Sequence, residues 1–98
     1  MIFMCMMEYP ADKRDLVRVR PGHRVYLLGL VADGRAIATG SFVPDDDGGL
    51  FIYEAASLHD AQSLVDHDPY IIEKVVTRYM LREFEVHAVN PRLLRVTG

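Results

Sequence analysis

The sequence lacks tryptophan, has a single cysteine and contains no apolar run of the roughly 20 residues that a membrane-spanning helix needs. The one cysteine, Cys5, excludes an internal disulfide, and its place in an apolar segment predicts a buried packing residue. The formal net charge is −3, and no lysine- or arginine-rich run is present. We therefore expect no nucleic-acid partner and no membrane association.

Motifs for common cofactors are missing as well. No GxGxxG, P-loop, GxSxG or CxxC pattern occurs, so we expect no cofactor. His59 and His67 are eight positions apart on an expected helix, which fits no standard zinc spacing, and we expect no metal site. The acidic run at 45–47 precedes two glycines, a composition typical of a solvated hairpin tip. The N-terminus lacks the features of a secretion signal, so we expect a cytoplasmic protein.

What the sequence does contain is a hydrophobic chain with strand signals. Half of its 98 residues are hydrophobic, and we expect one domain over residues 1–98. A nearly continuous apolar run at 2–8 is typical of a strand that is covered on both faces. Strands at 35–43 and 50–55 are expected to form a hairpin, and period-two alternation predicts a last strand over 78–89.

A helix is predicted between the first two strands. Proline is favoured at the first position of a helix, so we expect this helix to run from Pro21 to Asp33 and to end at Gly34. Its buried positions are predicted to be Val25, Leu28 and Ala32.

Two further helices are predicted before the last strand. Ser57 and Asp60 have a capping-box-like spacing, which predicts a helix to about His67. Its buried stripe is expected to be Leu58, Ala61, Leu64 and Val65. Asp68-Pro69 predicts the cap and start of a short third helix over 70–74.

The expected order β-α-β-β-α-β is the ferredoxin-like arrangement. It is an α+β fold with a four-stranded antiparallel sheet and helices on one face. Because helices cover one face only, the second apolar face of the first strand needs another partner. A second copy of the chain is the simplest one, and we expect a homodimer.

Several short motifs in the chain resemble those of the YciI-like (YCII-related) family. They occur in the same order over nearly the whole length: Arg20-Pro21-Gly22-His23, Asp33-Gly34-Arg35, Gly40, Gly48-Gly49-Leu50-Phe51-Ile52 and Asp68-Pro69-Tyr70. The resemblance implies a dimeric α+β barrel and a pocket that holds a paired histidine and aspartate, here His23 and Asp68. The family includes a dehydrochlorinase, and muconolactone isomerases share the wider architecture, so a cofactor-independent lyase or isomerase is implied.

The candidate chemistry is acid–base catalysis by His23 and Asp68. In the first turn of the predicted helix, the helix dipole would keep the His23 ring neutral and able to accept a proton. Asp68 would accept a hydrogen bond from the ring and fix its tautomer. Such a pair suits elimination or isomerisation of a small anionic cyclic or enolic metabolite. Arg20 is a candidate for binding a substrate carboxylate, and Ser41 and Tyr70 are candidate hydrogen-bond donors.

Other interpretations of these residues stay open at the level of sequence. Asp68 precedes Pro69 as a simple helix cap would, and we expect one carboxylate oxygen not to serve both roles. His23 can also be a surface histidine. Glu85 and His87 join the site if their side of the last strand faces a dimer cleft, and are solvent-exposed otherwise. The rival function is a non-catalytic small-ligand-binding or protein-interaction module.

Overall fold

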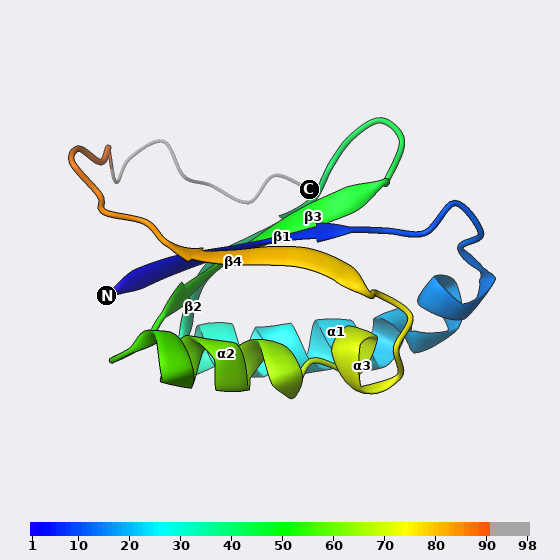
Figure 1. Ribbon diagram of the computed structural model, residues 1–98, viewed down its shortest axis with the longest axis horizontal. Coiled ribbons are helices and arrows are strands. Elements are labelled where there is room, and N and C mark those ends of the chain that lie inside the picture. Colours follow the sequence, from blue (N-terminus) through cyan, green and yellow to red (C-terminus); the bar gives the residue numbers. More distant parts are fainter. Residues whose placement is uncertain (91–98) are drawn as a thin grey trace.

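The computed structural model describes residues 1–90 and confirms the ferredoxin-like α+β order. Its elements are β1 (Ile2–Glu8), α1 (Arg14–Ala32), β2 (Ala36–Ser41), β3 (Gly48–Glu54), α2 (Leu58–Asp66), α3 (Pro69–Ile72) and β4 (Arg78–Glu83). The strands form one antiparallel sheet in the order β2-β3-β1-β4. All three helices lie on the same face of this sheet (Figure 1).

The central strand β1 is apolar on both faces of the sheet, as predicted. Phe3, Cys5 and Met7 point to the helices and are at most 1% exposed. Met4 and Met6 alternate with them and point to the opposite face, where Met6 pairs with Leu50 of β3 and Met80 of β4. The core therefore lies between the sheet and the helices. The opposite face of the sheet, with Met4, Met6 and Met80, is called the methionine side, and residues 1–90 place no second layer over it.

Helix α1 begins seven residues earlier than the sequence predicted, and Pro21 lies inside it. The expected buried stripe was wrong, because Val25 is 72% and Leu28 is 68% exposed and Ala32 is exposed too. The face that does pack on the sheet repeats every three or four residues: Leu16, Val19, His23, Leu27 and Leu30. Burial of this stripe offsets the one hydrogen bond that Pro21 cannot donate inside the helix.

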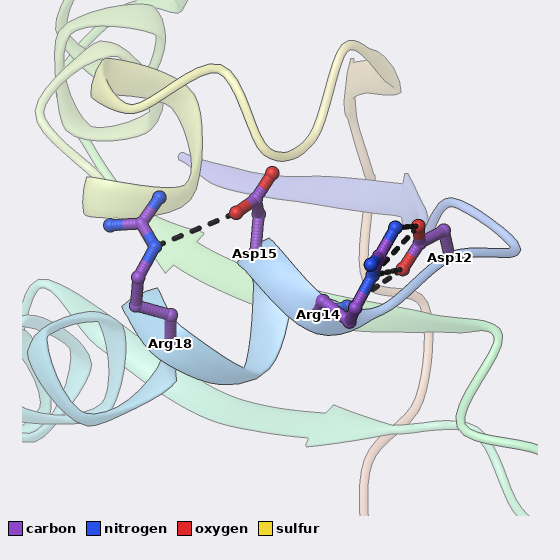
Figure 2. Close-up of polar contacts among 4 residues, drawn as sticks. All are labelled: Asp12, Arg14, Asp15 and Arg18. Atoms are coloured by element: carbon purple, nitrogen blue, oxygen red, sulfur yellow. Dashed lines mark hydrogen bonds and ion pairs between the residues drawn. The ribbon is translucent and has the colours of Figure 1, made fainter.

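Polar side chains hold the start of α1, which lies before the predicted helix start at Pro21. Asp12 accepts hydrogen bonds from the backbone N–H of Arg14 at 3.1 Å and from its guanidinium at 2.6 Å. Arg18 Nε lies 3.6 Å from Asp15, one turn away on the same helix (Figure 2). These pairs are exposed and contribute little individually. The Asp12 contact satisfies a first-turn N–H, a local reason for the helix to begin before Pro21.

The loop between β2 and β3 is fastened to the segment before and inside α1. The backbone N–H of Tyr9 donates to the carbonyl of Asp47 at 2.9 Å, and Lys13 Nζ donates to the carbonyl of Asp45 at 2.6 Å. Arg20 of α1 pairs with Asp46 in the same loop. Asp46 has a φ of 51°, a left-handed conformation that aspartate tolerates better than most residues. These three attachments bring the hairpin tip to α1.

The helices after the hairpin match the prediction closely. Ser57 accepts from the Asp60 N–H at 3.1 Å and caps α2, where Ala61 and Val65 are fully buried and Leu64 is partly buried. Leu58 was wrongly placed in this buried stripe, because it lies at the exposed first position of the helix and is 56% exposed. Within residues 1–90, no helix is long and apolar enough to span a membrane.

The last strand is shorter than predicted. β4 ends at Glu83, and the alternation that follows it in sequence is not part of the strand. Phe84 makes one further backbone hydrogen bond, to Ile2 at 2.8 Å. β1 begins at Ile2, so within residues 1–90 the chain beyond Phe84 has no neighbouring strand to pair with.

Candidate functional site

His23 and Asp68 form a buried hydrogen-bonded pair, although they are 45 positions apart in the sequence. His23 Nδ1 lies 2.7 Å from Asp68 Oδ1. His23 is 5% exposed and Asp68 is fully buried. A neutral imidazole that donates its Nδ1–H to a carboxylate oxygen at this distance keeps a lone pair on Nε2. A fixed tautomer with a free Nε2 is the arrangement that a general base needs.

The predicted position of His23 in the first turn of a helix was wrong. His23 was placed in the first turn of a helix, where the dipole would act on it. In the structure it is the tenth residue of α1, more than two turns from the helix start, and the effect of the dipole falls off within the first turn. The hydrogen bond to Asp68, and not the helix dipole, is the polar contact that orients the ring.

Asp68 serves as a helix cap and as the partner of His23 at the same time. Its Oδ1 also accepts the backbone N–H of Tyr70 at 2.9 Å, which caps α3. The expectation that one oxygen would not serve both roles was wrong, because a carboxylate oxygen has two lone pairs. The cap therefore positions the oxygen that holds His23, and the two interpretations of Asp68 describe one arrangement.

Aromatic rings hold the imidazole of His23 in place. The ring of Tyr70 stacks on it with the two centroids 3.6 Å apart and the planes 7° from parallel. Phe51 meets it edge-on at 5.4 Å, and Tyr9 meets Tyr70 edge-on at 5.6 Å. Phe51 and Tyr9 were not predicted as site residues: Phe51 lies in the middle of β3, and Tyr9 directly follows β1.

Arg20 is already engaged within the protein. Its Nε donates to the Tyr70 hydroxyl at 2.9 Å, and its Nη2 donates to Asp46 Oδ2 at 2.9 Å. The hydrogen bonds to Tyr70 and Asp46 raise the pKa of Arg20 further, so the guanidinium stays charged. The acidic run was predicted to form a solvated hairpin tip, and Asp46 is solvated only in part, because this pairing leaves its side chain 34% exposed. A substrate carboxylate at Arg20 would have to compete with Asp46.

The remaining candidate residues lie away from the pair. Ser41 is exposed at the end of β2. Glu85 and His87 follow β4, are 86% and 82% exposed and lie 3.5 Å from each other. His59 and His67 are exposed, and no group of three or more metal-ligating side chains occurs among residues 1–90. The structure thus brings together four of the candidate residues: His23, Asp68, Tyr70 and Arg20. It leaves Ser41, Glu85 and His87 outside this cluster.

Burial changes the acidity of the groups under the pair. Burial first, and then the negative charge of Asp68, raise the pKa of the Cys5 thiol to about 12. Burial also raises the pKa values of Tyr9, Tyr26 and Tyr53. These groups stay neutral in the folded protein at physiological pH, and ionising them favours the unfolded chain.

We expect alkaline pH to destabilise the protein through these groups. The folded pKa of Cys5 lies above its unfolded value of 9.0, so its stabilising contribution is complete below pH 9 and is lost as the pH rises toward 12. Over that range the free energy of unfolding should fall by up to about 1.4 kcal/mol per pH unit for this group. Urea unfolding between pH 8 and 11 measures the slope. Cys5→Ala should have a flatter slope, and an unchanged slope would contradict the assignment.

The fold and the site together define a class of protein: a ferredoxin-like α+β domain with a buried, cap-positioned histidine–aspartate pair on the helix side of its sheet. The model of the YCII-related domain matches residues 1–85. The chain therefore belongs to the YCII-related family, as its motifs indicated. No curated protein matches the sequence significantly.

Solved structures share the fold at low sequence identity. The 5-chloro-2-hydroxyhydroquinone dehydrochlorinase of Burkholderia phenoliruptrix AC1100, solved in complex with 2,5-dihydroxybenzoquinone, is 20% identical, with a TM-score of 0.73 over 87% of this chain and 94% of that one. An antibiotic biosynthesis monooxygenase is 11% identical, with a TM-score of 0.56 over 90% of this chain and 100% of that one. The Agrobacterium tumefaciens protein Atu4242 has the same identity and TM-score over 93% and 98%.

Proposed function

We propose that this protein catalyses a cofactor-independent elimination or isomerisation of a small cyclic or enolic metabolite, with His23 as the general base. The observation that carries the proposal is the 2.7 Å hydrogen bond between His23 Nδ1 and Asp68 Oδ1 in a buried setting. Membership of the YCII-related family and the structural likeness to a dehydrochlorinase support a lyase-type reaction.

The chemistry follows from the free ring nitrogen. In an elimination of HCl from the keto tautomer of a chlorinated hydroquinone, in which the carbon that bears chlorine is sp³, Nε2 of His23 accepts the proton of a conjugated hydroxyl group. The O–H electrons form a new C=O bond, the neighbouring π pair shifts toward the chlorinated carbon, and chloride leaves with the electrons of the C–Cl bond. The positive charge that forms on the imidazole is stabilised by the Asp68 carboxylate at Nδ1. The stacked ring of Tyr70 keeps the imidazole in one orientation during the transfer. An anionic substrate would displace Asp46 from Arg20.

The test uses 5-chloro-2-hydroxyhydroquinone as a probe and measures chloride release. We expect His23→Gln and Asp68→Asn each to lower kcat/KM by about 10²- to 10⁴-fold, the range for loss of a general base or its partner. His59→Gln, which changes an exposed histidine on α2, is the matched control and should keep full activity. Equal activity in all three variants would contradict the role of the pair. Binding of the probe without turnover in the wild type would instead favour a non-catalytic ligand-binding module. The slight exposure of His23 is compatible with such a module as well.

We also propose that two copies of the chain pack through the methionine side of the sheet. Met6 and Met80 are 42% and 47% exposed there. A cavity of about 310 Å³ lies on this side and is lined by Met4, Met6, Leu50, Met80, Arg82, Glu83 and Phe84. Flexible methionines adapt well to a facing apolar surface, and a contiguous apolar patch on a small domain is typical of an interface.

Met6→Asp is expected to convert the dimer into a monomer, because it would place two unpaired carboxylates at the centre of a symmetric interface. Sedimentation equilibrium at micromolar concentrations measures the change. Val25→Asp is the matched control, since Val25 is 72% exposed on the outer side of α1, and it should leave the mass unchanged. A monomeric wild type would contradict this mode of assembly.

A further inference from the structure

Two fully buried polar atoms, one of them in the His23–Asp68 pair itself, have no hydrogen-bond partner among the described residues. They are the hydroxyl oxygen of Tyr53 and Oδ2 of Asp68. Both residues are 0% exposed. Oδ1 of the same carboxylate accepts two hydrogen bonds, one from His23 and one from Tyr70. The other oxygen, Oδ2, is buried without a hydrogen-bond donor within residues 1–90. Buried polar atoms of this kind are normally satisfied by protein or by an ordered water.

The residues that carry the two atoms are connected through the neighbours they share. Phe51 and Tyr53 lie two residues apart on β3, about 7 Å along the strand, and both side chains point to the helices. His23 packs against Phe51 and bonds to Asp68, which brings the carboxylate over this strand. Cys5 pairs with Phe51 in the neighbouring strand and is also fully buried. The charge of Asp68 contributes, after burial, to the raised pKa values of Cys5 and Tyr53.

We propose that one water molecule binds between the Tyr53 hydroxyl and Asp68 Oδ2, and that Tyr53 acts through it as a positioning residue for the His23–Asp68 pair. The water accepts the Tyr53 O–H and donates one hydrogen to Oδ2. The Cys5 sulfur on the same face offers a weak third partner, and buried waters typically make about three such bonds. The positioning role rests on the proposed function, whereas the water site itself does not.

Deleting one hydroxyl tests the site through the sign of the effect on stability. Tyr53→Phe should lower the melting temperature if the hydroxyl is satisfied by the water, because its removal leaves Asp68 Oδ2 without a donor. Tyr26→Phe is the matched control, since its hydroxyl donates to the carbonyl of Leu64 at 2.6 Å and its loss should also lower the melting temperature. An unchanged or raised melting temperature in Tyr53→Phe would mean that the hydroxyl has no partner, and would overturn the proposal.

Direct observation of the water is the second measurement. A high-resolution crystal structure of the wild type should show density within hydrogen-bond distance of both oxygens, and Tyr53→Phe should lack it. An empty wild-type site overturns the proposal even if the stability result agrees with it.

The positioning role is read from the Nδ1–H proton resonance of His23. This resonance should move in Tyr53→Phe, because the carboxylate loses one donor, and should stay in place in Tyr26→Phe. If the water is present and the resonance does not move, the positioning role is wrong. These measurements need no turnover, so a wild type without chloride release would count against the proposed function alone.

Discussion

Replacing Asp68 with alanine is expected to lower the free energy of unfolding by about 3–5 kcal/mol, because each buried donor left unpaired costs about 1–3 kcal/mol and a lost helix cap costs about 1 kcal/mol. The substitution leaves two buried donors without an acceptor: Nδ1–H of His23 and the backbone N–H of Tyr70. It also removes the cap of α3. For a domain whose total stability is of the order of 5–15 kcal/mol, this is a large fraction.

Urea unfolding followed by circular dichroism measures this loss. Asp66→Ala is the matched control, because Asp66 is exposed at the end of α2. Within residues 1–90, its side chain accepts a hydrogen bond from Gln62. Its change should stay within about 0.5 kcal/mol, as for surface substitutions in general. Equal effects of the two substitutions would show that the double role of the Asp68 carboxylate carries no energetic weight.

Gly48→Ala is the second substitution with a large expected effect, a loss of about 3 kcal/mol, at the upper end for overpacking. A Cβ at Gly48 would overlap the backbone oxygen of Met7 and would lie 3.2 Å from the ring of Phe42. The clash is with backbone, so it cannot be relieved by turning a side chain. Relief requires β1 and β3 to separate where Glu8 pairs with Gly48.

A matched substitution at a glycine with free space should act in the opposite direction. A Cβ at Gly29, inside α1, would meet no atom within 4 Å. Alanine there should raise the free energy of unfolding by about 1 kcal/mol, the difference in helix propensity between the two residues. Thermal melts of the two variants against the wild type check both signs. Destabilisation by Gly29→Ala would mean that the outer side of α1 is packed against something in solution.

The fold was predictable because its signals are local. The apolar run of β1, the capping pattern at Ser57 and the Asp68-Pro69 start of α3 each depend on neighbouring residues, and each appears where it was expected. α1 was placed wrongly because Pro21 is a local signal that packing overrides. The buried repeat of α1 continues across Pro21 from Leu16 to Leu30, so the period of the apolar positions was the better guide.

The candidate site was predictable only in part. The motifs indicated His23 and Asp68, and the structure brings these two side chains into contact, while their catalytic role stays a prediction. Asp46 was not predicted as a site residue, and Phe51 was noted only as part of a motif, because a loop conformation and a strand register bring these two residues to the site. Arg20 shows the same limit. Its guanidinium identified it as a candidate for binding a carboxylate, whereas its partners Tyr70 and Asp46 are set by the tertiary structure.

The distance of 45 positions between His23 and Asp68 also has a consequence for the growing chain. During synthesis, α1 emerges long before the segment that contains Asp68, so the imidazole has no acceptor until the second half of the sheet and α3 are in place. Contacts of such sequence separation form only when the chain closes a long loop. The hydrogen bond between His23 and Asp68 therefore forms only with the final docking of α3, and a nascent or misfolded chain does not contain it.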